Sequence, residues 1–185
     1  MRKLKLQMNI SLDGFVGDSK GKLDWMLPEV DKKQIKLLHN LTKSVDTIIL
    51  GRIMATEAVP YWESVARTKA KDEEAVYADF FVRTSKIIFS KTLKNFEGQN
   101  ISIEKGNLKK SIMELKSEKG KDIIVYGGAK FVASLIEQKL IDELNLFVHP
   151  VAIGNGLPIF SKKSNFELIK SESYSNGIIL HQYQL

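Results

Sequence analysis

The 185-residue sequence contains no cysteine, only four prolines and no long apolar run. Without cysteine the chain cannot form a disulfide framework, a thiolate nucleophile or a cysteine-based zinc site. A membrane-spanning helix needs about 20 consecutive apolar residues, and no such stretch is present. Residues 1–10 alternate basic and apolar side chains, so they lack the continuous apolar core of a signal peptide. These absences favour a cytoplasmic protein that does not bind a membrane.

The composition is that of an ordinary globular domain, with 43% hydrophobic and 27% charged residues. No repeat or linker divides the chain, and each proline is expected at an element boundary. We therefore predict one domain over residues 1–185. The net charge of +6 favours an anionic partner. The lysines are scattered without a basic block interleaved with aromatics, which favours a solvated basic surface over nucleic-acid binding.

Short apolar segments predict the strands of a sheet. Alternation of apolar and polar residues predicts a strand over 4–10. Buried runs at 47–50, 86–89 and 122–126 are each followed by Gly or Ser and flanked by helical patterns. This pattern is typical of central, mostly parallel strands joined by crossover helices.

Apolar residues at helical spacing predict helices around 35–41, 108–118 and after Gly128, with a helix-like segment at 53–59. Towards the end of the chain, residues 144–148 predict a further strand. Ser175-Asn176-Gly177 then indicates a hairpin with a type I′ turn, which needs positive φ at both central residues. The expected fold is α/β with three αβα layers. Its central mixed sheet is mostly parallel and ends in an antiparallel C-terminal hairpin.

Three segments that follow buried strands suit a phosphate-bearing ligand: Tyr126-Gly127-Gly128-Ala129-Lys130, Gly51-Arg52 and Ser90-Lys91-Thr92. Paired glycines let backbone N–H groups approach a phosphate at a helix start. Arginine offers a planar charged fork, and hydroxyls with a lysine suit a ribose or its 2′-phosphate. Each segment also has a purely structural interpretation. The paired glycines, for example, are not a complete GxGxxG fingerprint and could form a tight turn between strand and helix. Together the three favour a dinucleotide site.

Other polar residues give weaker signals. Asp13-Gly14, in the loop after the first strand, is by itself a common turn pair. Glu29 and Asp31 follow Pro28 and are expected to cap the next helix, although either could donate a proton. His39, His149 and His181 lack metal-ligand spacing, so we predict structural roles for them and no metal site. No serine nucleophile elbow is present.

Taken in order, several of these segments resemble the dihydrofolate reductase-like superfamily, and within it the riboflavin-specific reductases with a RibD C-terminal-like domain. The resemblance covers nearly the whole chain. The segments are Ser11-Leu12-Asp13-Gly14, Leu50-Gly51-Arg52, Tyr61-Trp62, Ser90-Lys91-Thr92-Leu93, Gly127-Gly128-Ala129, 140–144, His149-Pro150-Val151, Gly154-Asn155-Gly156 and Phe160.

This resemblance implies a hydride reductase that uses NADPH, with 5-amino-6-(5-phosphoribosylamino)uracil reduction as the family activity. It places Val16 and Gly17 near the nicotinamide, and Asn9 and Asp13 beside the reacting centre. The cofactor phosphates are expected at Gly51, Arg52 and 126–129, and the adenosine side at Ser90 and Lys91. A phosphorylated small-molecule substrate would suit the positive charge.

The sequence also departs from its apparent relatives. Dihydrofolate reductases carry an acidic residue where this chain has Val30, which disfavours genuine folate reduction as the alternative activity. Met54 occupies a position where related proteins usually have threonine at the cofactor. A non-catalytic nucleotide-binding or nucleic-acid-binding module on the same fold is the alternative of another class. The terminal hairpin and the strand near 142–150 could expose an apolar edge, so we predict a homodimer.

Overall fold

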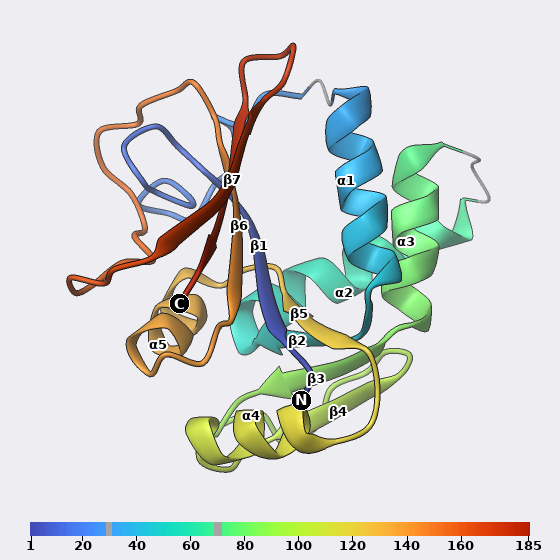
Figure 1. Ribbon diagram of the computed structural model, residues 1–185. Coiled ribbons are helices and arrows are strands. Elements are labelled where there is room, and N and C mark those ends of the chain that lie inside the picture. Colours follow the sequence, from blue (N-terminus) through green and yellow to red (C-terminus); the bar gives the residue numbers. More distant parts are fainter. Residues whose placement is uncertain (29–30, 69–71) are drawn as a thin grey trace.

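The structure, a computed structural model, describes residues 1–28, 31–68 and 72–185. Strands and helices alternate along most of the chain (Figure 1). In chain order they are β1 (Leu4–Ile10), α1 (Lys32–Lys43), β2 (Val45–Gly51), α2 (Arg52–Arg67), α3 (Glu73–Arg83), β3 (Ser85–Phe89), β4 (Ile101–Glu104), α4 (Leu108–Ser117), β5 (Asp122–Val125), α5 (Ala129–Glu137), β6 (Glu143–Val148), β7 (Glu167–Ser173) and β8 (Ile179–Gln184).

The strands form one eight-stranded sheet in the order β4-β3-β2-β5-β1-β6-β8-β7. All pairings from β4 to β6 are parallel. The terminal strands β8 and β7 are antiparallel to their neighbours. The predicted mixed, mostly parallel sheet with an antiparallel C-terminal hairpin is therefore confirmed.

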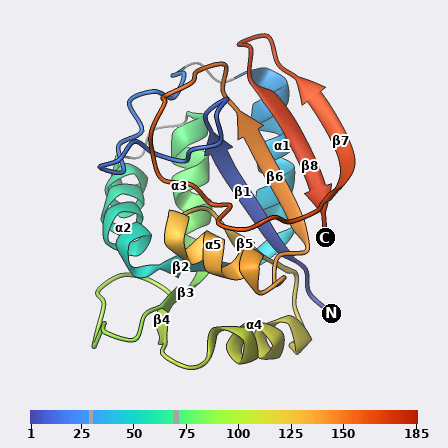
Figure 2. The same ribbon diagram turned by 90° about the vertical axis from the view of Figure 1, so that its left-hand side faces the viewer.

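Helices cover both faces of this sheet (Figures 1 and 2). On one face, α4 and α5 bury Ile112 and Leu135 against alternate residues of β1, such as Leu4 and Leu6. On the other, α2 and α3 pack against β2 and β3, and α1 packs against Phe147 and Leu180. The pleat of a strand points successive side chains to opposite faces, so β1 presents Asn9 to the α1 side and Ile10 to the α5 side.

Between β2 and β3 the helical structure is more extensive than the sequence indicated. The predicted segment 53–59 continues to Arg67, and α3 was not predicted at all. Pro60 lies inside α2 instead of at a boundary, where it removes one backbone hydrogen bond of the helix. Trp62, two residues later, packs against Tyr77 of α3 with ring centroids 4.6 Å apart. Such burial of large aromatic side chains offsets the lost hydrogen bond.

The turn between β7 and β8 also differs from its prediction. A type I′ turn would need positive φ at both central residues, but Gly177 alone has positive φ within 174–178. The Gly177 N–H donates to the Tyr174 carbonyl, and the Tyr174 N–H donates to the Ile178 carbonyl. This pattern is a three-residue hairpin loop with its glycine in the left-handed region, an arrangement that also matches the twist of the strands.

The described residues contain neither a membrane-spanning helix nor a cluster of metal ligands. No helix among residues 1–28, 31–68 and 72–185 is both long enough and apolar enough to cross a membrane. In the same part of the chain, no three histidine, aspartate or glutamate side chains gather as metal ligands would.

Candidate functional site

The polar segments singled out in the sequence lie along one edge of the sheet. Five neighbouring strands in the order β3-β2-β5-β1-β6 run parallel, so their carboxyl ends share an edge. We call the residues that end or follow these strands the carboxyl-end edge. Ser90 follows β3, Gly51 ends β2, and Tyr126 follows β5. The loop after β1 continues the row. In parallel sheets this edge is where ligands bind.

Two helices begin at this edge without a side-chain cap. The N-caps of α2 and α5 are Gly51 and Gly128, and neither start has a side-chain hydrogen bond. The other three helices are capped by Asp31, Asp72 and Asn107. The first N–H groups of a helix need an acceptor and carry a partial positive charge. The uncapped starts of α2 and α5 therefore offer backbone donors to an anion.

The glycines at these starts allow close packing as well. A Cβ on Gly51 would lie 3.0 Å from Cβ of Phe131 in α5, and one on Gly127 would lie 3.3 Å from Sδ of Met54 in α2. Gly128 has a φ of 85°, which favours glycine. The glycines thus bring the first turns of α2 and α5 against neighbouring strand ends. The structural and the phosphate-binding interpretations of these glycines are compatible.

Exposed cations flank the two helix starts. Arg52 is the first residue of α2, Lys130 is the second of α5, and Lys91 follows β3. Within the described ranges, no carboxylate forms an ion pair with any of the three. Ser90 is partly occupied, because its Oγ accepts hydrogen bonds from the backbone N–H groups of Thr92 and Leu93. The edge therefore has unpaired positive charge beside uncapped helix starts.

Tyr126 contributes its backbone to this edge, while its side chain points into the packing. Its ring lies edge-on to Tyr77 of α3, with centroids 5.8 Å apart. Burial raises the pKa of the Tyr126 hydroxyl. The phenol is thus a neutral part of the α2–α3 packing. Within the predicted cofactor segment 126–129, Tyr126 contributes its backbone.

Asp13 braces the loop after β1. Its carboxylate accepts hydrogen bonds from Ser11 Oγ at 2.6 Å and from the backbone N–H groups of Ile153 and Gly154, at 3.1 and 2.7 Å. These bonds, that from Ser11 first, hold the pKa of Asp13 below its ordinary value. The carboxylate is therefore ionised and joins the β1 loop to the loop after β6.

Val16 and Gly17 continue this junction. The Val16 N–H donates to the Leu157 carbonyl, and the Leu157 N–H donates to the Gly17 carbonyl. At Gly156 a Cβ would lie 2.3 Å from the Gly17 carbonyl oxygen, so only glycine fits between the two loops. The conformation of the segment predicted to contact the nicotinamide thus depends on residues about 140 positions later.

His149, just after β6, lies at the centre of a buried polar contact. Its side chain is 1% exposed. Nδ1 lies 3.2 Å from the backbone N of Leu27, and Nε2 lies 3.1 Å from Oδ1 of Asn9. The ring of Trp25 meets the imidazole edge-on. Burial lowers the pKa of His149, which favours the neutral ring. The histidine links the 22–28 segment to β1, a role that only the pairing of β1 with β6 could have indicated.

Two acidic candidates, Glu29 and Asp31, precede α1 in the sequence. Asp31 is the N-cap of α1, as expected, and also accepts hydrogen bonds from the backbone N–H and the hydroxyl of Ser175 in the β7–β8 turn. These bonds lower the pKa of Asp31 to about 2. Glu29 lies outside the described residues.

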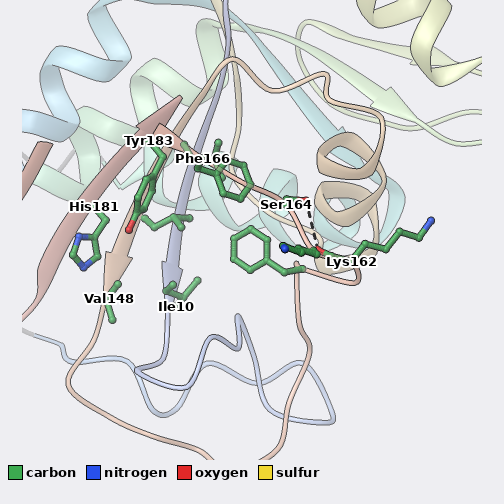
Figure 3. Close-up of a pocket in the computed structure, with 11 residues that line it drawn as sticks. Ile10, Val148, Lys162, Ser164, Phe166, His181 and Tyr183 are labelled. Atoms are coloured by element: carbon green, nitrogen blue, oxygen red, sulfur yellow. Dashed lines mark hydrogen bonds between the residues drawn. The ribbon is translucent and has the colours of Figure 1, made fainter. Parts of the chain in front are cut away.

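A cavity of about 520 Å³ lies between the sheet and the segment that follows β6 (Figure 3). Strand residues such as Ile10, Val148 and Tyr183 form its floor, and the 160–166 segment forms its wall. Because Ile10 and Val148 point away from the α1 side, this cavity lies across the sheet from Asn9 and His149.

The family assignment follows from a match to the RibD C-terminal domain model over residues 2–180. The chain belongs to the RibD C-terminal domain family. Two relatives from Bacillus subtilis align with the chain over most of its length, and both are uncharacterized. YyaP is 29% identical and YwjB 25% identical. The alignments cover 96% of this chain and 92% of YyaP, and 97% of both chains for YwjB.

Solved structures with the same fold include three named reductase-like or riboflavin-related proteins. A Shewanella sp. PV-4 protein provisionally assigned to riboflavin biosynthesis has a TM-score of 0.70 and 23% identity, covering 100% of this chain and 98% of its own. A diaminohydroxyphosphoribosylaminopyrimidine deaminase/5-amino-6-(5-phosphoribosylamino)uracil reductase of Thermotoga maritima has a TM-score of 0.69 and 17% identity. The match covers 99% of this chain and 56% of the Thermotoga chain. A pyrimidine reductase-like protein of Corynebacterium diphtheriae has a TM-score of 0.64 and 16% identity, and the match covers 99% of this chain and 91% of that protein. The predicted RibD and dihydrofolate reductase-like fold is thus confirmed.

Proposed function

We propose that this protein is an NADPH-dependent reductase of a heterocyclic substrate, with 5-amino-6-(5-phosphoribosylamino)uracil reduction as the activity implied by its family. The observation that carries the proposal is the pair of uncapped helix starts, α2 and α5, flanked by the exposed cations Arg52 and Lys91. Membership of the RibD C-terminal domain family supports it. So does the fold shared with the reductase of Thermotoga maritima.

The residues at the carboxyl-end edge fit a dinucleotide. The N–H groups at the starts of α2 and α5 suit the pyrophosphate, with the small residues Gly127, Gly128 and Ala129 leaving room for it. Arg52 would hold a phosphate in its planar fork. Ser90 and Lys91 follow β3, which is separated from β1 by β2 and β5, and would contact the ribose and its 2′-phosphate. This last contact is the basis for proposing NADPH over NADH.

In this proposal the chain mainly orients two rings. Bound NADPH supplies the hydride, and Val16 and Gly17 would hold its nicotinamide through a loop braced by Asp13. Asn9 would contact the substrate beside that ring. Asp31 would act by positioning α1, because its oxygens already accept hydrogen bonds from Lys33 and Ser175. Glu29 is retained as a candidate proton donor.

The remaining parts of the proposal concern substrate charge, location and assembly. A net charge of +6 suits a phosphorylated substrate. The absence of cysteine suits a reducing compartment such as the cytoplasm. A homodimer is proposed because the outer strand β7 exposes Leu168 and Ile169.

The first test is a titration of the purified protein with NADPH and NADH, followed by nucleotide fluorescence. Wild type is expected to bind NADPH more tightly than NADH. Arg52→Ala should weaken NADPH binding roughly ten- to a hundredfold, the range expected for lost hydrogen bonds between charged groups.

Arg67→Ala is the matched control, because Arg67 is an exposed arginine at the other end of the same helix. It should bind NADPH as wild type does. Failure of the wild-type protein to bind either nucleotide would overturn the reductase proposal and favour a non-catalytic module on this fold. Turnover of dihydrofolate would instead support the folate-reducing alternative.

A further inference from the structure

The hydrogen bonds around His149 determine which end of the Asn9 amide is occupied. The backbone N–H of Leu27 can only donate, so His149 Nδ1, 3.2 Å away, must accept. A neutral imidazole with an unprotonated Nδ1 carries its proton on Nε2. Nε2 lies 3.1 Å from Asn9 and must therefore donate to it. The atom of Asn9 that meets His149 is consequently the carbonyl oxygen Oδ1.

The other end of the same amide is unused. Asn9 Nδ2 makes no hydrogen bond to any residue in the described ranges 1–28, 31–68 and 72–185. The side chain is half-buried, on the face of β1 that α1 covers, next to the carboxyl-end edge. This NH₂ group therefore keeps two donors free for an acceptor on a ligand.

We propose that His149 is a positioning residue that holds the Asn9 NH₂ group ready for a hydrogen-bond acceptor on the substrate, such as the ring carbonyl of an oxo-heterocycle. The inference rests on the proposed reductase function and adds the residues that would recognise a ring carbonyl of the substrate. A substrate amino group at the same place would be a second donor facing the Asn9 NH₂ group, and neither would have an acceptor. Sites built to hydrogen-bond one group discriminate against a ligand that cannot complete the bond.

The orientation cannot reverse while Leu27 is in place. Rotating the amide by 180° would bring Nδ2 towards the Nε2 proton, which leaves the buried His149 donor without an acceptor. Tautomer exchange in His149 would in turn place a proton on Nδ1 against the Leu27 N–H. Trp25 meets the imidazole edge-on, with ring centroids 5.4 Å apart, and so restricts movement of the His149 ring. The 22–28 segment therefore fixes the polarity of Asn9 through His149.

The test compares pyrimidin-4-one, which presents a carbonyl acceptor at the expected contact, with 4-aminopyrimidine, which presents an amino donor there. Their affinities are measured by NMR titration with the full chain. Wild type should prefer pyrimidin-4-one roughly threefold to tenfold, as expected for one well-placed hydrogen bond. Asn9→Asp keeps an acceptor for His149 but presents a second oxygen to the ligand, so the preference should reverse.

His149→Asn separates the positioning role from folding. The shorter amide oxygen can still accept from Leu27, but no atom reaches Asn9, so the fragment preference should disappear in protein that circular dichroism shows to be folded at the temperature of the titration. His39→Asn is the control, because His39 lies on α1 and pairs with Glu73. It should keep the wild-type preference. An unchanged preference in His149→Asn would overturn the inference.

Nitrogen NMR of the ligand-free protein tests the hydrogen-bond chain directly. His149 should show a protonated Nε2 and an unprotonated Nδ1, and the opposite tautomer would refute the proposed orientation. Equal binding of the two fragments, or of neither, would overturn the substrate class. These results are separable from the NADPH titration. NADPH binding without a fragment preference counts against this inference alone, and a fragment preference without NADPH binding counts against the cofactor proposal.

Discussion

At the scale of single residues, Asp31 shows how one carboxylate can join distant parts of the chain. Oδ1 caps α1 by accepting from the Lys33 N–H, 2.7 Å away. Oδ2 accepts from the backbone and the hydroxyl of Ser175, 144 positions later in the β7–β8 turn. Asparagine caps helices about as well as aspartate but offers only one oxygen. The Asp31→Asn variant therefore isolates the link to the turn.

We expect Asp31→Asn to lower the urea midpoint of unfolding at neutral pH. In the folded protein the pKa of Asp31 is lowered to about 2, from the ordinary value of 3.8. A carboxylate whose pKa is lower in the folded state stabilises the protein fully above its pKa in the unfolded state. This stabilisation is lost as the pH falls through the pKa of the folded state. The difference between wild type and variant should thus be constant above about pH 5 and shrink between pH 4 and pH 2.

Asp79→Asn is the control for this experiment. Asp79 is exposed on α3 and pairs with Arg83 one turn away, so its replacement should hardly change the midpoint. A difference between Asp31→Asn and wild type that persists unchanged down to pH 2 would show that the ionised carboxylate is not what stabilises the turn.

At the scale of elements, the loops after β1 and β6 form one unit. Asp13 accepts from the backbone of Ile153 and Gly154, and the backbones of Val16, Gly17 and Leu157 exchange hydrogen bonds. A Cβ on Gly156 would lie 2.3 Å from the Gly17 oxygen and 2.9 Å from Phe15 Cβ. Since backbone atoms block the added methyl group, the loops must separate to admit it.

We predict that Gly156→Ala destabilises the protein by about 1–3 kcal/mol, the usual cost of overpacking, and also weakens NADPH binding. The first effect is measured by chemical unfolding and the second by fluorescence titration. Asn155→Ala, an exposed neighbour, should change neither. A loss of stability without any loss of NADPH affinity would place the nicotinamide away from Val16 and Gly17.

The elements differ in how well the sequence predicted them. The strands at 86–89 and 122–126 were found because buried parallel strands are short continuous apolar runs. Helix α3 was missed, and α2 was ended too early near Pro60. Proline disfavours a helix interior locally, but the packing of Trp62 on α3 is a tertiary effect that no local pattern contains.

The candidate site was predictable where it depends on single strand ends. Gly51-Arg52 and Gly127-Gly128 each follow a buried strand, so the edge they share could be inferred from the sequence. The Asn9–His149 contact could not, because it joins residues 140 positions apart through the pairing of β1 with β6. The bracing of Asp13 by Gly154 depends on a similar long-range contact.

At the scale of the whole molecule, the two edges of the sheet are unlike each other. One edge is β4, which has only four residues, and short edge strands resist pairing with another chain. The other is the seven-residue β7, where Leu168 and Ile169 are 55% and 52% exposed. Leu168 pairs with Tyr183, so it shares the sheet face that carries the 520 Å³ cavity. The exposed apolar surface thus continues from the edge onto this face.

We predict that a second copy covers this surface, giving a particle of twice the 20.9 kDa chain mass in light scattering at micromolar concentration. Leu168→Glu should shift the protein to monomer, because burying a carboxylate in an apolar contact is costly. Val76→Glu, at an equally exposed apolar position on α3, should remain dimeric. A wild-type monomer would contradict the prediction. Since the dimerising face lies across the sheet from Asn9 and His149, the fragment preference should survive dissociation.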